Sequence, residues 1–217
     1  MIINLNLQKR KVCIIGGGSE SLKRINSLLQ ENCKIIVISD KISSQISNLA
    51  VKKKIQIKKR RLKNAEFLKK ENPFMVITTT NNSKLNSEIL KKAKKMKMIS
   101  YSSDNPEESD FSNPSIINFE KMIEIAIFTG GKSPVMSKKI KEQVEKNLKK
   151  TISREDIEQI KIQEIARKIA KKKIHDQNQR KEFLNNLTHD KEIKQLIKER
   201  QKKKVEYRIH EILRDWK

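Results

Sequence analysis

The chain has 217 residues, of which 35% are hydrophobic and 35% charged, and its formal net charge at pH 7 is +24. This length suits one medium domain with an appendage or two small domains, and the composition is polar without being typical of disorder. No apolar segment approaches the roughly 20 residues of a membrane span, and the N-terminus lacks the apolar core of a signal peptide. We therefore expect a soluble, cytoplasmic protein that does not enter a membrane.

The two cysteines, Cys13 and Cys33, do not form a CxxC pair. Isolated intracellular cysteines mostly pack as small hydrophobic side chains, so we expect two buried free thiols rather than a disulfide or a zinc site. The histidines His175, His189 and His210 also lack ligand spacing, and surface positions are expected for them. The sequence thus predicts no metal site.

Residues 11–110 alternate short β-rich segments with segments whose apolar residues recur at helical spacing. This alternation predicts an α/β fold, a Rossmann-like doubly wound parallel sheet with helices on both faces. We assign residues 1–113 to this domain. The predicted strands are 11–15, 34–39, 55–59, 75–80 and 98–103, and the helices between them are 19–32, 43–54, 64–72 and 83–97. Asn32, after the first helix, is expected to adopt a left-handed backbone conformation.

The pattern changes after residue 113. Two strands are predicted within 116–129, with Phe119–Lys121 as the turn between them, and a helix follows in which Ser133 is the N-cap and Pro134 lies in the first turn. Two strands and one helix cannot bury both of their faces alone. We therefore interpret 114–150 as a small α+β dimerisation region and expect a homodimer.

The remaining segment, 151–217, contains no glycine or proline and shows helical periodicity throughout. It predicts a small helical C-terminal region, with loops near 174–179 and 186–190.

Gly16, Gly17 and Gly18 follow the first predicted strand and precede the first predicted helix, which begins at Ser19; with Ser21 they form G-x-G-x-x-S. In such a motif one glycine allows the tight turn, the next lets a pyrophosphate approach the backbone, and the third small residue lets the helix pack on the strand. The free N–H groups of the helix N-terminus favour phosphate. We predict a dinucleotide site that includes Gly16, Gly17, Gly18 and Ser19; a glycine turn without a ligand is the alternative.

The acidic residue that binds the cofactor ribose should end the second strand. Ser39 stands at the usual position and Asp40 follows it. Asp40 can reach the ribose hydroxyls or be a solvated loop residue, so the sequence favours NAD over NADP only slightly.

Several stretches together resemble the precorrin-2 dehydrogenases of siroheme synthesis, including the dehydrogenase–ferrochelatase module of siroheme synthase. The resemblance covers roughly residues 3–148 and rests on "INLNLQKRKVCIIGGGSESLKR", "VITTTNNSKLN", "SDNPEESDF", "NPSII" and "FTGGKSPVMSKKIKE". It implies that NAD removes a hydride from precorrin-2 to give sirohydrochlorin. Some family members also insert iron, so divalent iron is a further candidate substrate, although we expect a dehydrogenase alone.

Asp104 in "SSDNP" matches an aspartate that is central to the family's activities, and the resemblance implies that it acts as general base. The alternative is that Asp104 caps the turn before Asn105-Pro106. The resemblance further places Thr79 and Thr80 in the cofactor site. It places Asn86, Lys132 and Ser133 in the substrate site.

This chain departs from the family at several positions. "QKRK" replaces a turn that usually holds glycine, Ser21 stands where alanine is usual, and Asn105 where aspartate or alanine is frequent; Lys23-Arg24 falls where the family has an Arg-Lys pair. None of these departures removes a chemically required group.

The family assignment implies a substrate with eight carboxylates, for which a basic cleft would raise affinity and encounter rate. Nucleic acid is the competing partner for so basic a chain. Aromatic residues make up only 4% of the chain, and lysines are spread over nearly every predicted helix, so a solvated basic surface accounts for most of the charge. A non-catalytic nucleotide-sensing module and a basic nucleic-acid-binding protein are the alternative functions.

Overall fold

The computed structural model describes residues 2–216, which form two compact units, one up to Asn113 and one from Pro114 onward. Within these residues, no helix combines the length and the apolar character that a membrane crossing requires.

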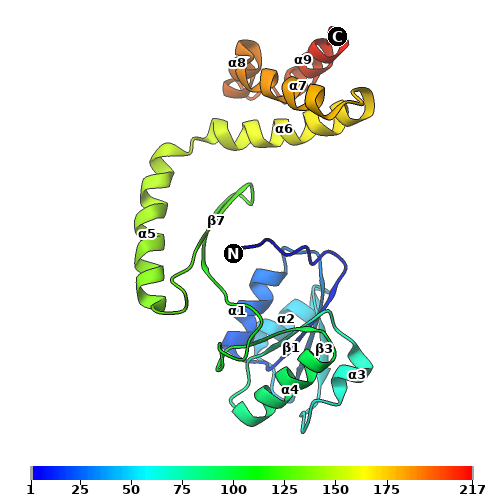
Figure 1. Ribbon diagram of the computed structural model, residues 1–217, viewed down its shortest axis with the longest axis vertical. Coiled ribbons are helices and arrows are strands. Elements are labelled where there is room, and N and C mark those ends of the chain that lie inside the picture. Colours follow the sequence, from blue (N-terminus) through cyan, green and yellow to red (C-terminus); the bar gives the residue numbers. More distant parts are fainter. Residues whose placement is uncertain (1, 217) are drawn as a thin grey trace. The chain divides into compact units, whose positions relative to one another are not determined.

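The first unit contains a sheet of five parallel strands in the order β3-β2-β1-β4-β5 (Figure 1). The order reverses direction between β1 and β4, which places the ligand crevice of such sheets at the carboxyl ends of these strands. The predicted Rossmann-like fold is confirmed. The elements are β1 Lys11–Ile15, α1 Ser19–Leu28, β2 Lys34–Ser39, α2 Ser44–Val51, β3 Gln56–Lys59, α3 Phe67–Glu71, β4 Met75–Thr78, α4 Ser83–Lys95 and β5 Ile99–Ser102.

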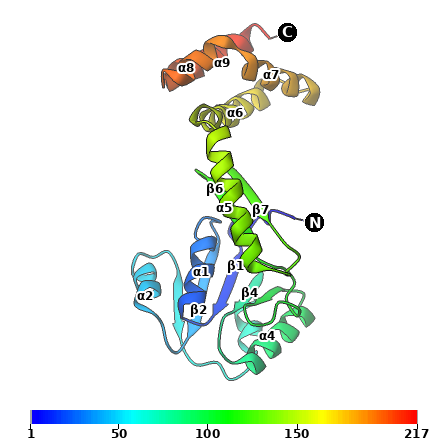
Figure 2. The ribbon, with the colours of Figure 1, turned by 90° about the vertical axis from the view of Figure 1, so that its left-hand side faces the viewer.

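Alternate residues of the central strand supply two separate cores. Val12 and Ile14 of β1 belong to the cluster that α1 and α2 cover, whereas Cys13 and Ile15 belong to the cluster under α3 and α4. Figure 2 shows α1 and α2 to one side of the sheet and α4 to the other. Successive side chains of a strand point to opposite faces, so a strand covered on both faces must be apolar along its whole length. This explains why "VCII" shows no polar alternation.

The turn before β1 contains no glycine, and a left-handed lysine takes its place. Lys9 adopts a left-handed backbone with φ of 62°, and its N–H donates to Asn32 O at 3.0 Å. Asn32 itself has φ of 51°, as predicted for this residue. The two loops at this edge of the sheet therefore support each other.

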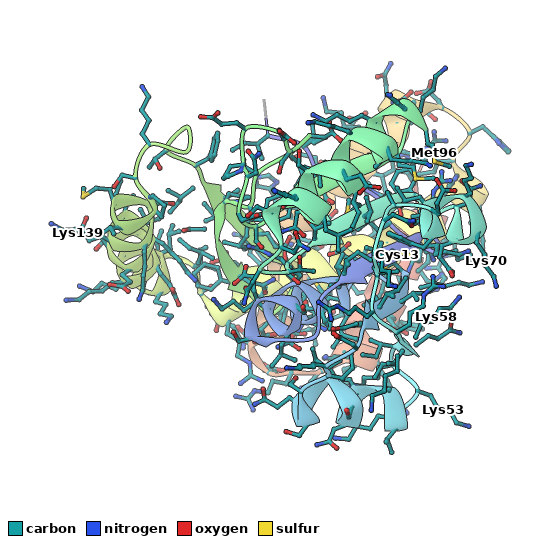
Figure 3. All side chains as sticks on the ribbon, turned by 90° about the horizontal axis from the view of Figure 1, so that it is seen from below. Cys13, Lys53, Lys58, Lys70, Met96 and Lys139 are labelled. Carbon is teal, nitrogen blue, oxygen red and sulfur yellow. The ribbon has the colours of Figure 1, made fainter. Side chains whose placement is uncertain are left out.

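Cys13 is a fully buried free thiol, as predicted, and lies in the interior of the first unit (Figure 3). Burial, together with the nearby Glu71 carboxylate, raises its pKa to about 12, so the thiol stays protonated and unreactive. Glu71 is 3% exposed and forms an ion pair with Lys58 at 2.7 Å. Cys33 is also a free thiol, as predicted, but it is half-buried rather than buried, because it precedes β2 and packs only at the margin of the core.

The second unit begins with an antiparallel hairpin, β6 Ser115–Phe119 and β7 Ile123–Ile127, followed by α5 Pro134–Thr151. Positive φ values at Glu120 and Lys121 make the turn. Ser133 caps α5 as predicted, because its Oγ accepts from Met136 N at 3.2 Å.

Four further helices complete the second unit around a core of their own, in which Phe183 and Leu187 are fully buried. The predicted loop near 186–190 shrinks to Asp190, which ends one helix and caps the next through Ile193 N at 2.7 Å. The three histidines are exposed, as predicted. The helices are α6 Arg154–Lys173, α7 Gln177–His189, α8 Lys191–Lys198 and α9 Lys202–Arg214.

Candidate cofactor and active site

The glycine loop between β1 and α1 is packed against two neighbouring segments. Gly16 has φ of +125°, and a Cβ there would lie 2.4 Å from Thr79 Oγ1. A Cβ on Gly17 would lie 2.1 Å from Lys41 O, in the loop after β2. The protein's own packing therefore requires glycine at both positions.

Gly18 differs from its neighbours, because a Cβ built there meets no atom within 4 Å. It is the N-cap residue of α1, and no side chain caps this helix. The N–H groups of the first helical turn have no intrahelical partner, so they point into the space beside Gly18 with a partial positive charge. An open glycine before an uncapped helix fits the pyrophosphate of a dinucleotide.

Ser21 and Thr79 join α1 to the end of β4. Ser21 is fully buried, and its Oγ lies 2.7 Å from Thr79 Oγ1, which in turn donates to Ile15 O at 3.0 Å. Ser21 is the third small residue of the glycine motif. The Thr79 hydroxyl was predicted to face the cofactor, but here it fastens the glycine loop to the sheet.

Ser39 and Asp40 lie at the carboxyl end of β2. Ser39 Oγ donates to Lys41 O at 2.8 Å, whereas Asp40 is exposed. Asp40 borders a hollow of about 440 Å³ that is also lined by Lys41, Ile42, Ser47, Ile57 and Lys59. Asp40 Oδ1 accepts from Lys41 N at 3.0 Å. Of the two predicted ribose-binding residues, Asp40 is thus the exposed one, and it borders the hollow.

Asp104 follows β5 at the same edge of the sheet and is exposed. Its Oδ1 accepts from Asn86 Nδ2 at 3.0 Å and from Ser102 Oγ. Burial alone would raise the pKa of Asp104, but hydrogen bonds from Ser102, Ser83 and Asn86 outweigh it and hold the pKa below the ordinary aspartate value. The carboxylate is therefore ionised at neutral pH and can accept a proton.

Asn86 lies in α4 and is 1% exposed. Its Oδ1 accepts from Thr80 Oγ1 at 2.6 Å, and its Nδ2 donates to Thr80 O at 2.9 Å and to Asp104. These contacts occupy the Asn86 amide and the Thr80 hydroxyl. Asn86 was predicted to bind substrate; in the structure it instead supports Asp104.

The turn after Asp104 has its own cap. Asn105 Oδ1 accepts from Glu108 N at 3.2 Å, so Asn105 fills the capping role that we considered for Asp104. Asp104 is thereby left free for another role.

Lys132 and Ser133 belong to the second unit, whereas the other predicted site residues belong to the first. Lys132 is exposed, and Ser133 Oγ is used as the cap of α5.

Sequence reasoning missed Thr78 and Ser102. Both are fully buried, they face each other in the β4–β5 register, and Thr78 Oγ1 donates to Ser102 Oγ at 2.7 Å. The sequence feature that could have revealed them is a hydroxyl residue near the end of each of two successive β-rich segments. Among residues 2–216, no three His, Cys, Asp or Glu side chains gather as metal ligands.

The family model described as putative NAD(P)-binding matches residues 3–115. Precorrin-2 dehydrogenase from Bacillus subtilis (strain 168) is 29% identical over 144 residues, which are 66% of this chain and 86% of that protein. Precorrin-2 dehydrogenase from Priestia megaterium is 28% identical over 149 residues, 67% of this chain and 69% of that protein. Siroheme synthase from Buchnera aphidicola subsp. Acyrthosiphon pisum (strain APS) is 31% identical over 143 residues, 66% of this chain but 29% of that protein.

A solved structure of SirC, precorrin-2 dehydrogenase, has the same fold. It aligns with a TM-score of 0.72 at 22% identity, covering 97% of this chain and 99% of that one.

Proposed function

The chain belongs to the putative NAD(P)-binding family, and from this membership we propose that it oxidises precorrin-2 to sirohydrochlorin with NAD, in siroheme biosynthesis. The matches to two precorrin-2 dehydrogenases support this activity rather than a nucleotide sensor or a nucleic-acid-binding protein. The observation that carries the proposal is the placement of the exposed Asp104 carboxylate at the same sheet edge as the open Gly18 loop. A hydride acceptor and a proton acceptor can thus serve one substrate.

NAD, when bound, supplies the acceptor for the hydride. Gly18 and the first turn of α1 would hold its pyrophosphate, and Asp40 would bind its ribose hydroxyls; the open space beside Gly18 and the hollow next to Asp40 support these roles. The oxidation also releases a proton from the substrate, and Asp104 takes it. Lys132 carries a positive charge suited to a substrate carboxylate. A cytoplasmic location stays a prediction.

Replacing Asp104 by asparagine tests the assignment. Asp104→Asn keeps the size and most hydrogen bonds of the side chain but removes the basic oxygen. We expect NAD affinity to be unchanged and precorrin-2 oxidation to fall by roughly 10²–10⁴-fold, the usual contribution of a positioned base. The assay follows the absorbance change to sirohydrochlorin, and wild-type activity in the variant would overturn the role of Asp104.

The same pair of proteins tests metal insertion. Wild type and Asp104→Asn are incubated with sirohydrochlorin and Fe²⁺, and metal insertion is followed by absorbance. We expect sirohydrochlorin to stay metal-free with both proteins. If the wild type inserts iron and Asp104→Asn does not, Asp104 takes part in both reactions.

We also propose that the chain forms a homodimer through residues 114–148. Ser137 is the one buried residue of α5, and the apolar side chains Ile116, Phe128, Val135 and Met136 are 39–78% exposed. A second copy would cover these apolar surfaces. Sedimentation velocity at micromolar concentration should show a dimer, and a Val135→Glu, Met136→Lys double variant should shift it to a monomer; a stable wild-type monomer would contradict the proposal.

A further inference from the structure

Two buried polar side chains from different elements hold the Asp104 carboxylate. Asn86, the fourth residue of α4, is 1% exposed, and Ser102, the last residue of β5, is fully buried. Both donate to the same oxygen, Oδ1. Neither of these buried donors uses Oδ2. Ser83, at the exposed start of α4, is a further donor to the carboxylate.

Both donors are themselves fixed by further hydrogen bonds. Ser102 Oγ accepts from Thr78 Oγ1 at 2.7 Å, so its own proton is directed to Asp104. The Asn86 amide is oriented by Thr80, through Oγ1 at 2.6 Å and the backbone oxygen at 2.9 Å. Each donor has a defined orientation, and its polar groups are occupied within the protein.

The direction of these bonds argues against a proton relay. Thr78 and Ser102 are fully buried in the sheet, and the row of hydroxyls therefore begins in the interior and ends at Asp104. Asp104 is exposed, so a proton that it accepts can leave directly to solvent. The buried groups can orient and stabilise the carboxylate but give the proton no route.

We propose that Asn86 and Ser102 are positioning residues that fix Oδ1 of Asp104 and thereby aim Oδ2 at the substrate proton, an inference that rests on the proposed oxidation of precorrin-2. Such fixed geometry raises the rate because the base need not be oriented during each turnover. This role differs from substrate binding, since neither residue has a free polar group for a ligand.

Hydrogen bonds, rather than a neighbouring charge, keep Asp104 ionised. The largest opposing effect on its pKa is burial, and the donors that lower it are Ser102, Ser83 and Asn86. Among the described residues, none of the titratable side chains on the surrounding elements hydrogen-bonds to Asp104. These side chains are Lys84, Glu88, Tyr101, Glu107 and Glu108.

The test compares Ser102→Ala with Ser100→Ala. Ser100 lies on the same strand, is also fully buried, and donates to a different carboxylate, Asp110 Oδ2, at 2.8 Å. Loss of one hydrogen bond to a charged group should lower kcat about tenfold in Ser102→Ala. NAD affinity should not change. The acidic limb of kcat/KM should move to higher pH, because the Asp104 pKa rises when a donor is lost.

Ser100→Ala should leave the kcat and the pH profile as in wild type, and Ser102→Thr, which keeps the hydroxyl, should restore both. A carbon-13 NMR titration of the Asp104 carboxyl, without substrate, gives a second readout: the pKa should rise in Ser102→Ala and in Asn86→Ala, and stay constant in Ser100→Ala. Folded Ser102→Ala with a wild-type titration and a wild-type kcat would overturn the inference. A wild type that fails to oxidise precorrin-2 would refute the proposed function, whereas the NMR titration would still decide whether these donors hold Asp104.

Discussion

Gly17 and Gly18 are neighbours in the chain, but glycine is needed there for different reasons. A Cβ at Gly17 would collide with the backbone oxygen of Lys41 at 2.1 Å, whereas a Cβ at Gly18 meets no atom within 4 Å. Gly17 therefore serves folding, whereas the role that we propose for the open Gly18 is to let the cofactor's pyrophosphate approach the backbone. A stability measurement and a binding measurement separate the two roles.

We expect Gly18→Val to keep the melting temperature of wild type and to lose NAD binding, because its side chain fills the space that we assign to the pyrophosphate. Gly17→Ala is the matched variant, and it should lower the free energy of unfolding by about 1–3 kcal/mol, the usual cost of overpacking. Circular dichroism gives the stability and calorimetric titration the NAD affinity. Folded Gly18→Val with wild-type NAD affinity would contradict the cofactor site.

At the level of single residues, the sequence draws attention to exposed candidate site residues more readily than to buried ones. Asp104 and Gly18 follow predicted strands, and the position after a parallel strand already implies the ligand edge. The pairing of Thr78 with Ser102 depends on the register of β4 and β5, which neither segment reveals alone. Asn86 was placed in the substrate site because sequence shows residue type and not burial.

At the level of elements, the sequence predicts which segments form strands, but it does not predict the residues at which strands and helices end. The fourth and fifth strands were predicted to end at 80 and 103 but end at Thr78 and Ser102. Serine and threonine occur both in strands and in the turns that follow them. The hydrogen bonds of their side chains therefore decide where the strand ends. Asp190 likewise ends α7 and caps α8 in one residue, where a loop of several residues was expected.

The C-terminal helices form a core whose stability can be measured separately. Phe183 is fully buried there and meets Trp216 edge to face at 5.3 Å, and Trp216 is the single tryptophan of the chain. We expect Phe183→Ala to destabilise this bundle by about 3–5 kcal/mol. Its tryptophan emission should shift to the red, and NAD affinity should be unchanged.

Tyr207→Ala is the control for this prediction, since Tyr207 is an aromatic residue of the same bundle that is 66% exposed. Its unfolding free energy should stay within about 0.5 kcal/mol of wild type. Equal unfolding curves for Phe183→Ala and Tyr207→Ala, followed by tryptophan fluorescence, would show that Phe183 is not part of the core.

At the level of the whole molecule, the net charge of +24 is the property most relevant to a substrate with many carboxylates. The charge is distributed over the first unit as well as the second, and Figure 3 shows Lys53, Lys58 and Lys70 along the outer side of the first unit. A distributed positive charge attracts a polyanion from a distance. Salt screens this attraction, since the Debye length is about 10 Å at 0.1 M ionic strength. The charge should therefore act on substrate encounter more than on the chemical step.

We expect the KM for precorrin-2 to rise severalfold between 0.05 M and 0.5 M NaCl while kcat changes little, because salt weakens the encounter and leaves the bound geometry intact. Sodium sulfate at equal ionic strength is the control for a specific effect of chloride, and both salts should give the same curve. NAD carries far fewer negative charges than a substrate with eight carboxylates, so its affinity should depend less on salt. A KM for precorrin-2 that stays constant over this range would show that the lysines are a solvated surface without a role in substrate capture.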